Sequence, residues 1–517
     1  MTIVSLIYTF LLSMYLFFYN ENILQKQYYE IKRFFKSKKQ NFKINYFKII
    51  LVILSIILVF LNIKTTWLNH LIIFLTFIFS FFIYHRKINN KIIKFKITKR
   101  VVRALVCYFI SYGLYILLVI LLKIPFSYIL LLYYFVFFVF FLISYFLSLV
   151  IENIILLHYQ ILAKKKLEKF KHLIVIGISG SYGKTSLKHY LKNLLETKYC
   201  VLASQKSYNT MKGLLMCINN DLKPYHEILI LEMGVDKIKG MDKFIKFFKL
   251  DIGILTCIGM QHLSTFKTFK NIVSEKAKLL QSLKTNKLAI INKDDENIYE
   301  LSKKLKCKKI FVSSYSFADI YATNIKIRAN CTFFTLHINN EEIPIQTKVL
   351  GRHHVNNLLL AIAVAKHLNI KEEQIIRHLR LLKNIENRME YKKDHNWDII
   401  DDSYNSNYEG FLQALSVLKK AKNKKVLLTP GLIELAKENE NYNKNLALKI
   451  KESANLVLIT NLNGQSIYQE LLKQKFTEEN LFLFESYFEA IKYLKEHYFD
   501  ESLTILIEND LPDIYLK

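Results

Sequence analysis

The chain has 517 residues, enough for about two to four domains of roughly 150 residues each, and 52% of them are hydrophobic. This composition excludes a disordered chain, a collagen and a small disulfide scaffold. The six cysteines lie far apart and include no CxxC pair, so the spacing of zinc, haem and thioredoxin-type sites is missing. We expect six reduced, buried thiols.

The formal net charge of +30 is unevenly distributed along the chain. Residues 1–170 contain 22 Lys and Arg against 4 Asp and Glu, whereas the remaining 347 residues contain 51 against 39. The excess lies mainly between hydrophobic segments, where the positive-inside rule places it. The sequence shows no basic helix interleaved with aromatic residues, so we expect no nucleic-acid partner.

Five apolar runs within residues 1–165 approach or exceed the length needed to cross a bilayer. They are Ile3–Tyr19, Ile49–Leu61, Leu71–Tyr84, Ala104–Leu122 and Phe126–Ile151. The second and third are short and close together, which favours a helical hairpin and leaves a re-entrant pair open. The basic loops after the first and third runs predict a multi-pass protein of the inner (cytoplasmic) membrane, with everything from about residue 165 in the cytoplasm.

A phosphate-binding loop is predicted after the apolar region. From Lys171 onward, short apolar runs alternate with amphipathic helices, which is typical of a parallel α/β sheet. The strand His172–Ile178 leads into Gly180–Ser186, with the sequence GSYGKTS, and then into the helix Leu187–Glu196. Glycines let backbone N–H groups approach phosphate oxygens, Lys184 can reach the terminal phosphates, and a hydroxyl can bind Mg²⁺. The spacing is the shorter GxxGKTS and not the full GxxxxGK[ST].

Further polar residues follow the ends of predicted strands. The strand Ile228–Leu231 ends at Glu232, and the strand Ile252–Cys257 is followed by His262, with Lys276 fourteen residues later. The carboxyl ends of strands beside a phosphate-loop strand form the crevice where α/β sheets bind ligands. We therefore expect these side chains near the phosphate loop.

The order of these motifs resembles the Mur ligase superfamily, the ATP-dependent amide-forming enzymes of peptidoglycan precursor assembly. The resemblance covers about residues 172–510. Ser207–Gly213, Gly259–His262 with Lys276, and Asp402–Asn407 are most similar to the MurF branch, which adds D-Ala-D-Ala to UDP-MurNAc-tripeptide. The resemblance implies an ADP-forming ligase with ATP and Mg²⁺ as cofactors. The implied partners are UDP-MurNAc-peptide, D-Ala-D-Ala and other peptidoglycan-synthesis proteins, and the apolar runs add the membrane as a partner.

The resemblance also implies roles for individual residues. The implied catalytic residues are Lys184, Glu232, His262 and Lys276. The implied ATP-binding residues are Gly180, Gly183, Lys184, Thr185, Ser186, Asn292, Asn356, Arg388 and Asp402. The implied metal ligands are Thr185, Glu232, His262 and Lys276, the lysine as a carbamate. The implied substrate-binding residues are Asn209, Tyr404, Asn405 and Asn407.

The expected fold class is a multi-pass α-helical membrane region, then an α/β central P-loop domain and a C-terminal Rossmann-like α/β domain. We place these domains at residues 1–165, 166–383 and 384–517. The boundary near Lys383 follows the predicted helix Lys371–Leu382 and precedes Arg388. A hinge there would let the third domain close ATP into the cleft.

The chain departs from the family pattern in three places. Apolar runs stand where the MurF branch has a small domain that grips the UDP sugar. Lys278 occupies the position of a family Glu, and Thr210 and Leu215 replace a family Asn and Pro. Glu508–Pro512 replaces a basic segment that resembles Lys-Gly-Ser-Arg. The ATP half of the site is therefore better matched than the acceptor half.

Three alternatives remain open. A ligase of the same fold could act on another carboxylate, such as a lipid-linked muropeptide or a poly-glutamate chain. A P-loop ATPase could drive a transporter, but the sequence lacks an LSGGQ-like signature and its apolar runs lack charged pathway residues. A non-catalytic scaffold would not need the phosphate-loop lysine together with Glu232, His262 and Lys276.

Overall fold

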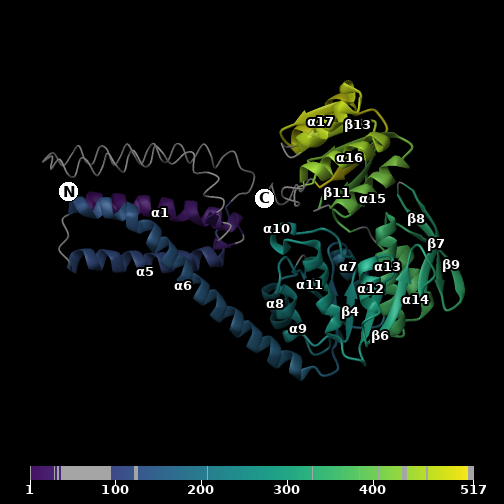
Figure 1. Cartoon of the computed structure of the whole chain (residues 1–517), viewed down its shortest axis with the longest axis horizontal. Coiled ribbons are helices and arrows are strands. Elements are labelled where there is room, and N and C mark those ends of the chain that lie inside the picture. Colours follow the sequence, from purple (N-terminus) through teal and green to yellow (C-terminus); the bar gives the residue numbers. More distant parts are fainter. Residues whose placement is uncertain are drawn as a thin grey trace. The chain divides into compact units, whose positions relative to one another are not determined.

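The computed structural model describes residues 2–27, 29–31, 34–35, 95–121, 126–205, 208–328, 330–382, 385–404, 407–432, 439–460 and 464–509. The chain divides into two compact units, one within Met1–His158 and one within Tyr159–Pro512. In the described residues, helices form the first unit, and two β-sheets with covering helices form the second (Figure 1).

The first unit contains the helices α1 (Thr2–Lys26) and α5 (Lys99–Leu121) and most of α6 (Phe126–Lys169). Aromatic side chains form its core, with the rings of Phe17 and Tyr108 4.9 Å apart. The outward faces of α5 and α6 expose large apolar side chains at helical spacing, as at Val106, Ile110 and Leu114.

By length and composition, two helical segments of the described residues could cross a membrane, Lys99–Leu118 and Val139–Lys169. The first, fourth and fifth predicted apolar runs fall on α1, α5 and α6. The second and third runs, Ile49–Leu61 and Leu71–Tyr84, lie outside the described residues.

The first sheet of the second unit has nine strands in the described residues, in the order β2-β3-β1-β4-β5-β6-β7-β8-β9. The strands are β1 (Ile174–Ser179), β2 (Val201–Ala203), β3 (Ile228–Glu232), β4 (Ile252–Leu255), β5 (Leu288–Asn292), β6 (Lys308–Ser313), β7 (Ile320–Ile327), β8 (Thr332–Ile338) and β9 (Glu341–Thr347). Pairing is parallel from β2 to β7 and antiparallel from β7 to β9. The central strands β3 and β5 are buried along their whole length and apolar except at their last residues, Glu232 and Asn292, because helices cover both of their faces.

Side chains alternate between the two faces of this sheet. Ile176, Ile230 and Ile254 face one side, where they pack with α7 (Lys184–Leu195) and α13 (Arg352–His367). The other helices around this sheet are α8 (Met211–Asp221), α9 (Gly240–Phe247), α10 (Leu263–Phe266), α11 (Phe269–Gln281), α12 (Glu296–Ser302) and α14 (Glu372–Leu381). A Cβ on Gly253 of β4 would lie 2.9–3.0 Å from leucine methyl groups of α11 and the turn after it, which shows how closely α11 packs.

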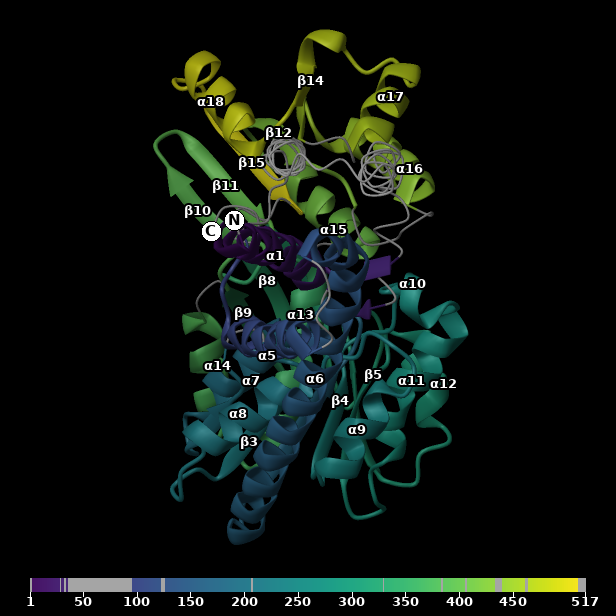
Figure 2. The same ribbon diagram turned by 90° about the vertical axis from the view of Figure 1, so that its left-hand side faces the viewer.

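The second sheet, as far as the structure describes it, has six strands in the order β10-β11-β15-β12-β13-β14. They are β10 (Glu390–Asp394), β11 (Trp397–Asp402), β12 (Lys424–Thr429), β13 (Leu456–Thr460), β14 (Leu481–Phe484) and β15 (Leu503–Glu508), with helices α15 (Tyr408–Lys419), α16 (Asn439–Ser453), α17 (Gln465–Lys473), η4 (Glu478–Asn480) and α18 (Tyr487–His497). Leu427 packs with the cluster of α15, α16 and α17, whereas its neighbours Val426 and Leu428 pack with the cluster of α18. The helices therefore cover opposite faces, as Figure 2 shows.

The two predicted α/β sheets are confirmed, with differences at element ends. The helix after the phosphate loop begins at Lys184 and not at Leu187, because Lys184 to Ser186 already form its first turn. The helix that carries Lys276 begins at Phe269, after the capping residue Thr268. The predicted boundary near Lys383 lies outside the described residues.

The prediction of six buried thiols is wrong for three cysteines. All six are free, but Cys200 is exposed, and Cys257 and Cys331 are half-buried. Cys200 lies in the connection before β2, where the backbone returns to the sheet from the protein surface.

Candidate active site

The phosphate loop connects β1 to α7 at the centre of the nine-stranded sheet. Strand β1 has β3 on one side and β4 on the other, so the strand order reverses here and the carboxyl ends open a crevice. Gly180 has a φ of +145°, and a Cβ there would lie 2.0 Å from Thr256 Oγ1. Gly183 precedes α7 with a φ of +76°. The loop therefore needs glycine at both positions.

Lys184 opens α7 and folds back over the loop. Its Nζ donates to the carbonyl oxygens of Gly180 at 2.8 Å and Ser181 at 3.0 Å. The N–H groups of the first turn of α7 and the positive end of its dipole lie at the same place. Ser186, which with Lys184 and Thr185 was predicted to bind the nucleotide, is buried. The loop is thus shaped to hold an oxyanion.

Glu232 lies at the carboxyl end of β3, against the first two turns of α7. It accepts a hydrogen bond from Thr185 Oγ1 at 3.0 Å and pairs with Lys188 Nζ at 2.9 Å. The Lys188 and Glu232 side chains are only 5% and 1% exposed. The sequence did not single out Lys188, although its place one helical turn after Lys184 puts it on the same face of α7. This buried ion pair fixes the predicted metal-binding carboxylate beside the predicted metal-binding hydroxyl.

Lys276 is buried on α11 and not on a solvated face. Its side chain donates from Nζ to Ser181 Oγ at 3.0 Å, and Ser181 is bonded in turn to the backbone of Gly259. Burial lowers the pKa of Lys276 well below its usual value, and the nearby Lys184 charge lowers it further. Lys278 points away and pairs with Asp242 and Glu275. The buried side chain of Lys276 therefore joins α11 to the phosphate loop.

His262 lies in the loop after β4. It has a φ of +53°, and its carbonyl oxygen accepts the backbone N–H groups of Thr265 and Phe266, which starts α10. The same loop contacts the phosphate loop where Tyr182 Oη donates to the Met260 carbonyl oxygen. Within the described ranges, no three His, Cys, Asp or Glu side chains are grouped so that they could hold a metal ion. Of the predicted metal ligands, Thr185 and Glu232 contact each other directly, and Lys276 reaches Ser181 of the phosphate loop.

Two predicted nucleotide residues touch each other at the carboxyl end of β5. Asn356, on α13, donates from Nδ2 to Asn292 Oδ1 at 2.9 Å and to Asp294 Oδ2 at 2.8 Å. Asn292 in turn donates to the Thr256 carbonyl oxygen at 2.6 Å. The buried Asn356 Oδ1 has no hydrogen-bond partner among the described residues. An amide oxygen left open in this way suits a ligand donor such as an exocyclic amine.

Arg388 and Asp402 come together at the edge of the second sheet. The Arg388 guanidinium lies 4.2 Å from the centre of the Tyr404 ring, and the Asp402 carboxylate accepts from the backbone N–H of Met389 at 3.1 Å. Burial raises the pKa of Asp402 to about 6, and the Arg388 charge opposes this rise. Burial lowers the pKa of Arg388, whereas Asp402, Tyr404, Glu232 and Tyr190 raise it. The influence of Glu232 places Arg388 within electrostatic reach of the phosphate-loop region.

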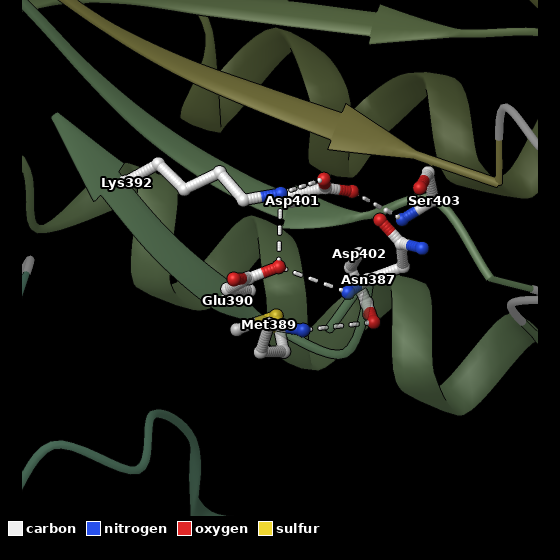
Figure 3. Close-up of polar contacts among 7 residues, drawn as sticks. All are labelled: Asn387, Met389, Glu390, Lys392, Asp401, Asp402 and Ser403. Atoms are coloured by element: carbon white, nitrogen blue, oxygen red, sulfur yellow. Dashed lines mark hydrogen bonds and ion pairs between the residues drawn. The ribbon is translucent and has the colours of Figure 1, made fainter. Parts of the chain in front are cut away.

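Charged contacts hold the turn that carries Arg388 (Figure 3). Lys392 pairs with Asp401 at 2.8 Å and with Glu390 at 2.9 Å. Glu390 also accepts the backbone N–H of Asn387 at 3.1 Å. Asn387 and Met389 have positive φ values of 57° and 49°, so this tight turn depends on the polar contacts around it.

A buried pair of neutral groups lies behind the phosphate loop. Tyr190 Oη on α7 contacts His354 Nδ1 on α13 at 2.8 Å. Burial lowers the pKa of His353 to about 4 and that of His354 well below its usual value. Both imidazoles are therefore neutral near pH 7, and the contact between Tyr190 and His354 joins the two helices that carry the phosphate and amide contacts. Nothing in the sequence indicated that Tyr190 would contact His354.

The predicted substrate-binding residues are less completely placed. The Asn209 carbonyl oxygen accepts from Gly234 N at 2.8 Å, so its loop lies against the end of β3. Asn407 caps α15 by accepting from Gly410 N at 2.8 Å, and Tyr404 lies under Arg388. Asn405 lies outside the described residues.

Residues 178–365 match a protein family described as the Mur ligase middle domain. The chain is similar to UDP-N-acetylmuramoyl-tripeptide–D-alanyl-D-alanine ligases. It is 29% identical to that of Buchnera aphidicola subsp. Baizongia pistaciae over 52% of this chain and 59% of that protein, and 24% identical to that of Escherichia coli K12 over the same shares. The chain thus spans about three fifths of the length of these relatives.

The fold is also similar to solved structures. A MurF structure from Acinetobacter baumannii aligns with a TM-score of 0.63 and 21% identity over 70% of this chain and 79% of that one. MurF from Thermotoga maritima in complex with ADP aligns with a TM-score of 0.61 and 22% identity over 68% and 80%. The α/β part of the chain therefore has the Mur ligase fold.

The buried pair between Lys188 and Glu232 predicts an asymmetric loss of stability. Lys188→Met should lower the free energy of unfolding by about 3–5 kcal/mol, because it leaves Glu232 charged and buried without its cation. Adding Glu232→Gln should recover most of that loss. Urea unfolding of the full chain measures both. Lys192→Met, at an exposed position of the same helix, is the matched control and should change stability by less than about 0.5 kcal/mol. Additive losses in the double variant would contradict the pairing.

The raised pKa of Asp402 predicts a pH dependence of stability. Because the folded pKa is about 6 and the ordinary value is 3.8, the folded chain binds more protons than the unfolded chain between these values. The free energy of unfolding contributed by this group should therefore fall as pH rises from about 4 to about 6. Asp402→Asn should remove that decline in urea unfolding measured across pH, whereas Asp394→Asn, on exposed β10, should retain it. Parallel pH profiles for the parent and Asp402→Asn would refute the assignment.

Proposed function

We propose that this member of the Mur ligase superfamily is an ADP-forming, ATP-dependent ligase that adds D-Ala-D-Ala to UDP-MurNAc-tripeptide in peptidoglycan precursor synthesis. One observation carries the proposal. The glycine-lined phosphate loop, with Lys184 and Thr185 on its helix, lies beside the buried carboxylate of Glu232 on the adjacent strand. The similarity to D-alanyl-D-alanine ligases supports the choice of acceptor and amine.

The reaction needs an activated carboxylate. The acceptor carboxylate attacks the γ-phosphorus of ATP, ADP leaves, and an acyl phosphate forms. The amine then attacks the acyl carbon, a proton is lost from its nitrogen, and phosphate departs with one of the carboxylate oxygens. The negative charges must be brought together and neutralised. Lys184, the N-terminus of α7 and Arg388 are the groups of this chain that supply positive charge near the phosphates.

The chain's residues fit a Mg²⁺ ion at the phosphate loop. Thr185 and Glu232 present hard oxygen donors that already touch at 3.0 Å. When bound with ATP, Mg²⁺ would neutralise phosphate charge and orient the γ-phosphate. Asn292 and Asn356 would hold the base, because the open oxygen of Asn356 can accept from an amine. Asp402 would bind the ribose and Arg388 would bind a phosphate of ATP, both from the proposed C-terminal domain.

Lys276 is proposed to carry a carbamate. Its lowered pKa favours a neutral amine, which can add to CO₂ with loss of one proton to give an N-carboxylate. A carbamate here would act with Glu232 and His262 as a ligand of a metal ion. A buried ammonium group at the same place would repel that ion. Lys278 stands where the resemblance expects Glu, and it is held away by Asp242 and Glu275.

We also propose that the protein is a multi-pass protein of the cytoplasmic membrane with its α/β domains in the cytoplasm, where ATP is available. The two long apolar helical segments and their exposed apolar faces support this localisation. We keep the proposed domain limits at 1–165, 166–383 and 384–517.

The direct test incubates the purified full chain with ATP, UDP-MurNAc-tripeptide and D-Ala-D-Ala. We expect release of ADP and phosphate only with both substrates, and a product whose mass is the sum of the two less one water. Lys184→Ala should lower the rate by about a hundredfold or more at an unchanged unfolding temperature, whereas Lys192→Ala should match the parent. Turnover by Lys184→Ala at the parent rate would contradict the loop assignment. Turnover only with a lipid-linked muropeptide or a poly-glutamate chain would contradict the proposed acceptor.

The carbamate has its own test. Lys276→Ala should lose most activity and regain part of it with added short carboxylates, whereas Lys278→Ala should have a mild effect. With ¹³C-labelled bicarbonate, the parent should show a carbamate carbon resonance that Lys276→Ala lacks. Equal effects of the two substitutions, or the same spectrum from both proteins, would return Lys276 to a structural role.

A further inference from the structure

The last turns of α6, from Tyr159 onward, belong to the second unit and pack against the rest of it along one helical face. Tyr159, Ala163 and Lys166 follow an i, i+4, i+7 spacing, which places them on the same side of the helix. Ala163 is fully buried, whereas its neighbours Lys164 and Lys165 are exposed. The buried methyl group shows that this face of α6 lies directly against the body of the unit.

Lys166 makes a cap for the end of another helix. Its Nζ donates to the carbonyl oxygens of Ile218 at 3.0 Å and Asn219 at 2.9 Å, in the last turn of α8. Asn219 returns a bond from its Nδ2 to the Tyr159 carbonyl oxygen at 3.0 Å. Helix α8 has no basic residue in its own last turn, so Lys166 supplies the cation that open carbonyl groups and the helix dipole favour. We call these three reciprocal bonds the α6–α8 clamp.

The other end of α8 carries the loop that meets the active-site crevice. Thr210 caps this end through Gly213, and Asn209 precedes it. The Asn209 carbonyl oxygen accepts from Gly234 N at 2.8 Å, two residues after Glu232. A Cβ on Gly234 would lie 2.7 Å from Asn209 Cγ, so this contact is close. Displacing α8 would therefore move Asn209 relative to the end of β3.

A second bond ties the two ends of this segment together. Gln205, before the loop, donates from Nε2 to Asp221 Oδ2 at 3.0 Å, at the end of α8. Gln205 is thereby tied to the last residue of α8, and the clamp holds α8 at this same end. The groups that contact ATP in the proposed function lie on other elements, namely the phosphate loop, α7, β5, α13, β11 and the turn before β10.

We propose that the end of α6 positions the acceptor substrate, with Lys166 as a positioning residue that acts through α8 on the Asn209 loop. This inference rests on the proposed function, because it takes the Asn209 loop to bind the proposed acceptor, UDP-MurNAc-tripeptide. It gives the apolar helix a role beyond tethering, because α6 is one continuous helix from Phe126 to Lys169 and its end holds a substrate loop in place.

The test compares kinetic constants of full-length variants. Lys166→Gln should raise the KM for UDP-MurNAc-tripeptide about tenfold, which is the scale of one lost hydrogen bond to a charged group, and leave the KM for ATP unchanged. Asn219→Ala, which removes the return bond, should shift the same constant in the same direction. Lys166→Arg keeps a cationic donor and should restore most of the parent value. Lys165→Gln, at the exposed neighbour, is the matched control and should equal the parent.

The outcomes separate this inference from the proposed function. If the parent shows no turnover with UDP-MurNAc-tripeptide, the proposed function fails and the inference falls with it. If the parent is active and Lys166→Gln equals Lys165→Gln, the inference alone is wrong. Equal rises in both KM values, or a lower unfolding temperature with both KM values unchanged, would assign the clamp a structural role and overturn the proposal.

Discussion

The buried ion pair between Lys188 and Glu232 is the constraint on which the rest of the site depends. Two opposite charges removed from water must stay together, because either one alone would be costly to bury. The pair joins β3 to α7, and Thr185 binds the same carboxylate from the preceding turn of the helix. These two contacts fix the position of α7 relative to β3, and therefore the position of Lys184 relative to the phosphate loop. The neutral contact from Tyr190 to His354 then connects α7 to α13.

The parts of the site that the sequence predicted are local. A strand, a glycine turn and a helix start are consecutive in the chain, so the phosphate loop followed from GSYGKTS. Glu232 followed from its place at the end of an apolar run, because parallel strands bring their carboxyl ends to one edge. The burial of Lys276 could not be predicted locally, because it depends on α11 packing so closely against the sheet that the amine of Lys276 reaches Ser181. The resemblance marked this residue, but its charge state is a property of the packing.

The parts that the sequence did not predict depend on distant partners. Nothing local to α7 indicates that Lys188 would pair inside the protein and Lys192 outside it. The antiparallel strands β7 to β9 alternate apolar and polar residues, but they extend a parallel sheet, and local patterning carries no information on which sheet a strand joins. The α6–α8 clamp likewise joins residues that are more than fifty positions apart. The sequence indicates only that Lys166 belongs to a basic group, Lys164–Lys166, after an apolar run.

The central claim is that an acceptor carboxylate attacks ATP and leaves as an acyl phosphate. Labelling that carboxylate with ¹⁸O and analysing the released phosphate by mass spectrometry tests it most directly. The account predicts one ¹⁸O atom in each phosphate formed during amide synthesis, because the carboxylate oxygen that attacked phosphorus departs with it. Phosphate that carries no label while the amide product accumulates would contradict the account.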